Sequence, residues 1–165
     1  MPIPEYVRQL RQRIGNDLLL MPAVAGVVID DDGRVLLGRR SDTGRWAVVG
    51  GILEPGEELA AAVVREIFEE TAVVCEPTRI SGVYLSPVVT YPSTGDVAQY
   101  VVTTFACRYV SGVAKVNDDE SLDVGWFAPD ALPADLGPSH RVRVEHALSD
   151  ATAAFYRPAE AENLG

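Results

Sequence analysis

The stretch from residue 59 to residue 71 carries the pattern that most restricts how this chain can fold. At about 100° per residue, an α-helix over this stretch gathers Glu66, Glu69 and Glu70 within an arc of about 100°. The apolar side chains centre on the opposite side of the helix: Ala60, Val63, Val64, Ile67 and Phe68. One side of this helix is therefore expected to pack on the rest of the fold, while the other presents three carboxylates.

Three carboxylates on one helix face repel one another unless something binds between them. Glu66 and Glu70 are four residues apart, a spacing at which like charges cost roughly 0.2–0.5 kcal/mol in water. A bound cation would turn this repulsion into affinity. Oxygen ligands suit Mg²⁺ or Mn²⁺, and the two cysteines and two histidines have no zinc-ligand spacing. A solvent-facing acidic helix is the alternative interpretation.

The residues around this helix indicate how such a site would be supported. Arg65 precedes Glu69 by four residues and can hold its carboxylate in an ion pair. Glu57 would lie about 180° from Glu66 on a continued helix, so it is expected to act as an anchor from the preceding loop. The double glycine before this loop lets the backbone approach closely, which would leave the Gly50 carbonyl available as a further oxygen ligand.

Composition limits the classes of partner. The chain carries 14 Lys and Arg against 24 Asp and Glu, a formal net charge of −10, whereas proteins that bind polymeric nucleic acid use clustered basic side chains. A nucleic-acid polymer is therefore excluded as a partner, and any anionic substrate would need a bound cation. The chain has 165 residues, 47% of them hydrophobic, and at about 150 residues per domain a single domain with its own core is expected.

The order of apolar and turn-forming segments predicts a mixed α/β fold. Residues 4–14 place Val7, Leu10 and Ile14 on one face of a short amphipathic helix. Further segments are predicted as strands at 23–29, 35–37, 46–49, 80–85, 97–109 and 122–127, and as a helix from Pro138 to about Tyr156. The expected organisation is an N-terminal helix over 1–16, a main domain over 17–157 and a flexible tail over 158–165.

Three smaller features have competing interpretations. The aspartates at 30–32 indicate a turn, since they lack the ligand spacing of an EF-hand calcium loop. Cys75 and Cys107 could form a disulfide, but without an export signal they are expected to be buried thiols. The longest apolar stretch, 18–29, contains Pro22 and is well short of the roughly 20 residues that cross a bilayer. A soluble, cytoplasmic protein with no membrane contact is expected.

The spacing of the acidic residues resembles the signature of the Nudix hydrolases, G-x5-E-x7-R-E-U-x-E-E-x-G-U, in which U is aliphatic. The matching residues in this segment, the Nudix box over 51–73, are Gly51, Glu57, Arg65, Glu66, Glu69 and Glu70, with Ile67 and Val73 at aliphatic positions. The resemblance extends more loosely to Arg40 at a strand end, to Trp46 before the double glycine and to Trp126. It implies an α/β/α sandwich around a central mixed β-sheet, formed by residues 17–157.

The resemblance also implies an activity. Nudix hydrolases cleave the pyrophosphate of a nucleoside diphosphate linked to another moiety, with a metal-activated water as the nucleophile. A nucleoside triphosphate, ADP-ribose or a nucleotide sugar is the expected small-molecule substrate, a nucleoside monophosphate the product, and Mg²⁺, with Mn²⁺ as a substitute, the cofactor. By resemblance, Glu57 and Arg65 look like supporting ion pairs, and the metal ligands look like Glu66, Glu69, Glu70 and the Gly50 carbonyl.

Several roles are left open between a functional and a structural interpretation. The general base is either a glutamate of the box or Glu120, for which the alternative is an ordinary acidic turn. Arg40 is a candidate to bind substrate phosphate, against an ordinary surface arginine. The loop over 86–96 is expected to contribute to substrate recognition. Three aromatic residues either stack on a base or fill the core, and core packing is favoured for the first: Trp46, Tyr91 and Tyr100.

Two positions depart from the family pattern, one inside the box and one just before it. Ala72 replaces the glycine at which the family turns out of the helix, and Val49 replaces a proline that often precedes the double glycine. If residue 72 needs a positive φ, alanine costs about 1 kcal/mol there. Every carboxylate of the box remains, so catalysis is still expected. The alternatives are a non-catalytic nucleotide-binding module, action on a phosphorylated non-nucleotide, and an isomerase. A homodimer and a monomer whose first helix covers its own sheet are both consistent with the sequence.

Overall fold

The computed structural model describes residues 4–158, which form one mixed sheet and three helices. The predicted tail over 158–165 lies outside the described residues, apart from Pro158. The helices are α1 (Glu5–Ile14), α2 (Leu59–Thr71) and α3 (Pro138–Leu148). The strands are β1 (Leu19–Ile29), β2 (Val35–Arg40), β3 (Trp46–Ala47), β4 (Val49–Ile52), β5 (Val74–Leu85), β6 (Val89–Thr90), β7 (Val97–Ser111) and β8 (Ser121–Phe127).

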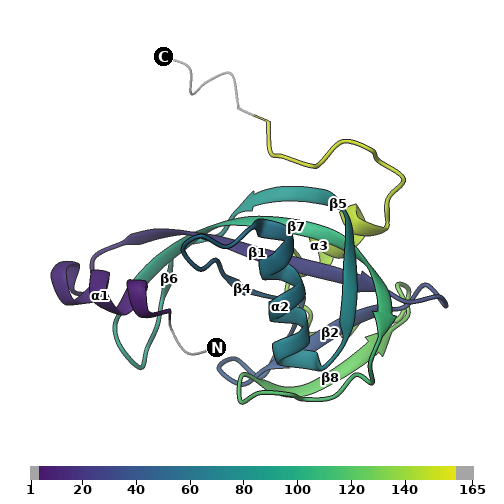
Figure 1. Ribbon diagram of the computed structural model, residues 1–165, viewed down its shortest axis with the longest axis horizontal. Helices are drawn as coiled ribbons and strands as arrows, with labels where there is room; N and C mark the ends of the chain where they lie inside the picture. Colours follow the sequence, from purple (N-terminus) through teal and green to yellow (C-terminus); the bar gives the residue numbers. More distant parts are fainter. Residues whose placement is uncertain (1–3, 159–165) are drawn as a thin grey trace.

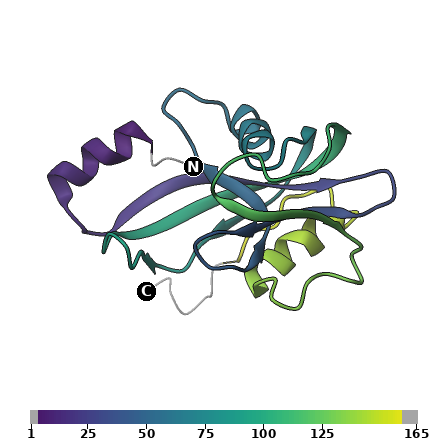
Figure 2. The ribbon, with the colours of Figure 1, turned by 90° about the horizontal axis from the view of Figure 1, so that it is seen from below.

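The sheet has 8 strands, with β1 in the middle of its main path β3-β2-β1-β7-β5. Strand β1 pairs in parallel with β7 and antiparallel with β2 and β4, so the sheet is mixed. Helix α2 covers one face of the sheet and α3 covers the other, as the two perpendicular views show (Figure 1 and Figure 2). The predicted α/β/α sandwich is confirmed.

Strand β1 is buried on both faces. Side chains alternate along a strand, so Ala23, Ala25 and Val27 join the core on the α3 side. Val24 and Val28 join the core on the α2 side. A strand covered on both faces is expected to be continuously apolar rather than alternating, and this explains the composition of the segment.

Helix α2 has the predicted bounds, but its buried face differs from the prediction. Phe68 is 49% exposed and Ala60 is also exposed, although both were predicted on the packed side. The helix is rotated so that Glu66 faces β4, and a helical wheel cannot fix this rotation because it does not locate the sheet. Gly26 of β1 allows close packing, since a Cβ there would lie 2.8 Å from a methyl group of Val63. The buried residues of α2 are Ala62, Val63, Glu66, Ile67 and Thr71.

Helix α2 ends in the left-handed backbone conformation that glycine normally provides. Ala72 has φ 57° and ψ 17°, and its N–H donates to the carbonyl of Phe68 at 2.9 Å. Within residues 4–158 it is the one non-glycine residue with a positive φ, so alanine carries backbone strain here. Strand β5 then begins at Val74, earlier than the predicted start at residue 80, because the chain pairs with β7 directly after this turn.

Helix α3 ends at Leu148, so the predicted extension to Tyr156 is wrong. The chain turns back after the helix, and Phe155 pairs with Gly82 at the edge of β5. Arg79 Nη2 satisfies the last helical turn by donating to three carbonyl groups, at 2.9 Å to His146, 3.1 Å to Ala147 and 2.8 Å to Ser149. These contacts join segments that are far apart in sequence, so local periodicity could not reveal them.

Helix α1 packs on residues of its own chain. Val7 is 3% exposed and contacts Met21 of β1 and Ala98 of β7. Leu10, predicted on the same apolar face, is 38% exposed. The arrangement in which the first helix covers its own sheet is therefore present, and a homodimer stays a prediction.

Three smaller predictions can be compared directly with the structure. The Asp30 carboxylate accepts hydrogen bonds from the N–H groups of Asp32 (3.1 Å) and Arg34 (2.8 Å), which forms the predicted turn. Cys75 and Cys107 are free and buried, as expected for small apolar residues. Between residues 4 and 158, no helix has the length and apolar character needed to span a membrane.

Candidate active site

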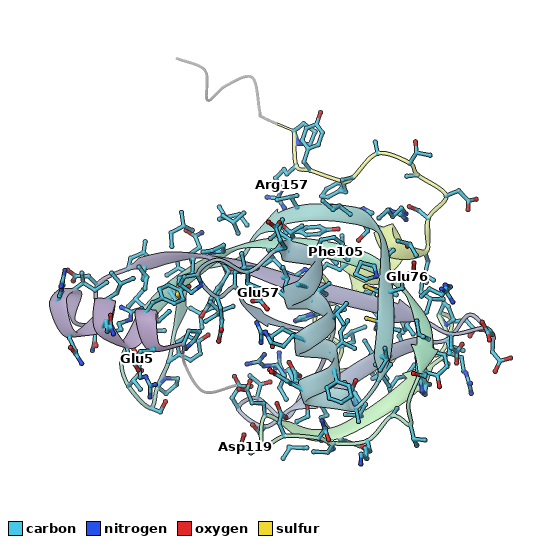
Figure 3. All side chains as sticks on the ribbon, viewed as in Figure 1. Glu5, Glu57, Glu76, Phe105, Asp119 and Arg157 are labelled. Carbon is cyan, nitrogen blue, oxygen red and sulfur yellow. The ribbon has the colours of Figure 1, made fainter. Side chains whose placement is uncertain are left out.

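Arg65 connects three of the box carboxylates. Its guanidinium donates two hydrogen bonds to Glu57, at 2.8 and 2.9 Å. The remaining terminal nitrogen, Nη1, donates to Glu66 at 2.9 Å and to Glu69 at 3.1 Å. Glu57 also accepts a hydrogen bond from the N–H of Glu54, which fixes it in the loop before α2. The hydrogen bonds from Arg65 hold the pKa of Glu57 below its ordinary value. Figure 3 shows Glu57 alongside α2.

Glu66 is buried under the glycine pair. Its side chain is 1% exposed, and a Cβ on Gly51 would lie 2.5 Å from its carboxylate carbon and from both oxygens. Glycine at residue 51 therefore makes the space that this carboxylate occupies. Burial raises the pKa of Glu66 to about 7, although the positive charge of Arg65 acts in the opposite direction. A buried carboxylate of this kind binds either a proton or a cation near neutral pH.

Glu70 faces another set of partners. Ser121, the first residue of β8, donates its hydroxyl to Glu70 Oε2 at 3.4 Å. Burial and the negative charge of Asp118 raise the pKa of Glu70 to about 7. Next to this carboxylate lies a cavity of about 10 Å³, room for about one water molecule or ion. The cavity is lined by Gly38, Arg40, Ala47, Val48, Val49, Gly50 and Glu70.

The box carboxylates have the chemistry of a hard-cation site, but they do not converge on one point. Glu66 and Glu69 both face Arg65, whereas Glu70 faces Ser121. Within residues 4–158, no three acidic, histidine or cysteine side chains form a ready-made metal site. The box carboxylates repel one another, and they stay apart because Arg65 and Ser121 hold them on different sides. The raised pKa values, the oxygen donors and the small cavity beside Glu70 still fit Mg²⁺ or Mn²⁺.

Arg40 shares the lining of this small cavity with Glu70, and it is close enough to Tyr91 for their charges to interact. Its guanidinium donates to both carboxylate oxygens of Asp42, at 2.8 and 2.7 Å. These hydrogen bonds, together with the charges of Asp42, Glu70 and Tyr91, raise the pKa of Arg40. Tyr91 and Tyr100 share a hydrogen bond between their hydroxyl groups at 2.8 Å. The structure thus brings two predicted substrate contacts, Arg40 and Tyr91, to the same side of the site.

Trp46 and Glu120 are two further residues that were predicted to act in the site. Trp46 packs edge-on against Phe127, with ring centroids 4.7 Å apart, and joins the core on the α3 side. Core packing is thus what the structure shows for Trp46. Glu120 is in the loop before β8, where its carbonyl accepts a hydrogen bond from the N–H of Ser41 at 2.7 Å. This loop returns to Glu70, since Ser121 follows directly.

Sequence reasoning missed some of the site. Ser121 and Asp118 both act on Glu70, but a serine and an aspartate in an acidic loop carry no pattern that would single them out. A second cleft, of about 330 Å³, lies on the outer side of α2, where Phe68 is exposed beside Glu69. Asp119 forms part of its wall, close to the end of α2 and to β8 in Figure 3.

Comparison with known proteins identifies the family. The family model for the NUDIX domain matches residues 19–147. The chain belongs to the Nudix family. A "MutT-like protein" of Streptomyces ambofaciens is 36% identical to it over 129 residues, which cover 78% of this chain and 77% of that protein. An ADP-ribose pyrophosphatase of Methanocaldococcus jannaschii is 36% identical over 121 residues, covering 70% of this chain and 68% of that protein.

A solved structure agrees with this assignment. The MutT protein from Methanosarcina mazei Go1 has a TM-score of 0.64 at 25% identity, over 79% of this Nudix chain and 94% of that chain. Other curated relatives are longer, and the chain spans 34% and 49% of two of them. The box is therefore a Nudix box by fold as well as by spacing, and the chain is a Nudix pyrophosphohydrolase. The family acts on nucleotide derivatives and generally uses divalent metal ions.

Proposed function

We propose that this Nudix enzyme hydrolyses the pyrophosphate bond of a nucleoside diphosphate linked to another moiety and releases a nucleoside monophosphate. The observation that carries the proposal is the carboxylate set around Arg65, with Glu66 buried against Gly51 and Glu70 beside the Gly50 backbone. A negatively charged site of this kind would bind a diphosphate only through divalent cations. The substrate range includes nucleoside triphosphates, ADP-ribose and nucleotide sugars. The ADP-ribose pyrophosphatase among the relatives supports this range.

We further propose the residues that hold the metal. Glu66, Glu69, Glu70 and the Gly50 carbonyl would bind Mg²⁺, with Mn²⁺ as a substitute. When bound, the metal supplies charge neutralisation and an activated water. Arg65 orients Glu66 and Glu69 by hydrogen bonds, and Glu57 holds Arg65 in place. This arrangement explains why an arginine stands in the middle of an acidic face.

The other groups bind the substrate and move the proton. Arg40 binds a phosphate oxygen with the guanidinium nitrogen that Asp42 leaves unpaired. Tyr91 contacts the moiety attached to the diphosphate. Glu120 or a box glutamate accepts the proton of the attacking water. Glutamine substitutions at Glu120 and at the box glutamates separate these candidates. Only the substitution that removes the general base shifts the pH dependence of kcat.

The test is a substrate panel in Mg²⁺ or Mn²⁺, with products identified by mass spectrometry and ¹⁸O-labelled water used to find the phosphorus attacked. Glu69→Gln and Glu70→Gln are expected to lower turnover at least about a hundredfold. Glu76→Gln is the matched control, because Glu76 is exposed and pairs with Arg108 on the sheet edge, away from the box. Normal turnover in both box variants would reject the proposal. Nucleotide binding without turnover across the panel would favour a non-catalytic binding module.

Two expectations about the cellular context belong to the same proposal. The free thiols of Cys75 and Cys107 suit the reducing cytoplasm. Self-association as a homodimer is tested by sedimentation at micromolar concentration. The domain over 17–157 contains the residues of the family match, 19–147.

A further inference from the structure

Helix α1 precedes the residues that match the family, 19–147. It nevertheless contacts the loop between β5 and β7. Arg11 Nη2 donates to the carbonyl of Val97 at 2.8 Å. Arg11 Nε lies 3.4 Å from the carboxylate of Asp96, in an ion pair whose two side chains are only 13% and 19% exposed. Arg11 Nη1 donates to the carbonyls of Gly15 and Asp17, at 3.1 and 2.6 Å. One side chain therefore ties the end of α1 to the end of this loop.

The segment that Arg11 holds is a compact turn that carries Tyr91. The N–H of Gly95 donates to the Tyr91 carbonyl at 2.7 Å, and the N–H of Tyr91 donates to the Asp96 carbonyl at 2.9 Å. Asn16 adds a contact from the chain just after α1, with its amide 3.3 Å from the Thr94 carbonyl. Displacement of Asp96 would therefore move Tyr91, which lies close enough to Arg40 for their charges to interact.

The other end of α1 contacts the loop that enters the box. Tyr6 donates its hydroxyl to the Leu53 carbonyl at 3.2 Å. Leu53 precedes Glu54, whose N–H holds Glu57, the partner of Arg65. Figure 1 shows α1 at the left of the molecule, where β1 begins, to one side of α2. Helix α1 thus contacts both the loop that carries Tyr91 and the loop that leads into α2.

We propose that α1 holds the 86–96 loop in a fixed position relative to the Nudix box, and that Arg11 is the positioning residue for substrate binding. The inference rests on the proposed function, because the loop is taken to contact the moiety attached to the diphosphate. Arg11 does not touch the box carboxylates, so its loss changes the binding of substrate and leaves the chemical step nearly intact. A variant in which α1 no longer holds this loop would discriminate less between substrates that differ in the moiety attached to the diphosphate.

The experiment compares Arg11→Gln with Arg13→Gln. Arg13 is on the same helix and is exposed, and within residues 4–158 its side chain has no hydrogen bond or ion pair. Two readouts are used: amide hydrogen exchange of residues 86–97, and KM and kcat for two substrates that differ only in the moiety beyond the diphosphate. Arg11→Lys, which retains the charge toward Asp96, is the conservative variant. Thermal unfolding confirms that each variant is folded.

Arg11→Gln is expected to speed exchange in residues 86–97 and to raise KM about tenfold, with kcat within about threefold of the parent enzyme. Arg13→Gln should match the parent, and Arg11→Lys should fall between them. Equal exchange in Arg11→Gln and Arg13→Gln, or a loss of kcat at constant KM, overturns the inference. If the parent enzyme hydrolyses nothing on the panel, the proposed function fails, whereas the exchange measurement still decides whether Arg11 holds the loop.

Discussion

The carboxylate of Glu66 occupies the space that a side chain at residue 51 would need: a Cβ built on Gly51 would lie 2.5 Å from both carboxylate oxygens. The glycine at residue 51 of the box therefore has a packing reason, because the side chain of Glu66 fills the space where a Cβ would be. Because Glu66 is also held by Arg65 at 2.9 Å, it cannot move aside without breaking that hydrogen bond. Residue 51 and residue 66 form one unit within the site.

Gly51→Ala is expected to displace Glu66 and to lower kcat about a hundredfold, the size of effect that a shift of about 1 Å in a catalytic group produces. Steady-state kinetics and Mg²⁺ titration measure it. Gly137→Ala is the control, since a Cβ there would meet its nearest neighbour, an atom of His140, at an ordinary 3.5 Å. Equal activity of the two variants would show that activity does not depend on the position in which Gly51 holds Glu66.

Arg65→Lys is expected to lower activity about tenfold or more and to weaken Mg²⁺ binding. A single ammonium group cannot replace the guanidinium that bonds Glu57 through two nitrogens and also reaches Glu66 and Glu69. Arg45→Lys serves as the control, because within residues 4–158 the exposed Arg45 side chain makes no hydrogen bond or ion pair. Unchanged Mg²⁺ affinity in Arg65→Lys would count against the supporting role.

The metal-free protein is expected to lose stability as the pH rises from about 4.5 to 7. The pKa values of Glu66 and Glu70 are raised from 4.5 to about 7 in the fold. In this window the folded protein therefore binds more protons than the unfolded chain, and the free energy of unfolding falls with pH. Mg²⁺ competes with these protons, so it should raise Tm more at about pH 8 than at about pH 6.

Glu66→Gln tests this pH dependence, because glutamine does not titrate. The variant should show a weaker fall in stability with pH and a smaller Mg²⁺ shift than the parent protein, whereas Glu76→Gln, on the exposed sheet edge, should match the parent. A Mg²⁺ shift that is the same at both pH values would contradict the expectation.

Ala72→Gly is expected to raise the free energy of unfolding by about 1 kcal/mol, which corresponds to a Tm increase of about 2–4 °C. The reason is the left-handed backbone of Ala72, at φ 57°. Ala61→Gly, at an exposed position inside α2, should instead lower stability by about 1 kcal/mol. Thermal unfolding of the two variants gives opposite signs if residue 72 is strained, and the same sign if it is not.

The sequence determined the parts of this protein that depend on local spacing. The bounds of α2 and the box residues from Glu57 to Glu70 follow from positions along one short segment, because helical periodicity and ligand spacing are properties of neighbouring residues. The strand over 46–49 was predicted approximately, since apolar runs bounded by turns are local as well. The structure corrects the loop predicted after it, because Gly50 and Gly51 lie inside β4 and pair with β1.

Only the tertiary structure decided how α2 is rotated, which buries Glu66 and leaves Phe68 half exposed. It also decided which loops reach the site: Ser121 contacts Glu70 across 51 positions of sequence, and Arg11 contacts Val97 across 86. Such pairs form because the sheet brings distant segments together and buries their polar groups, which must then find partners. No local pattern encodes that choice, and it fixes the charge state and the shape of the site.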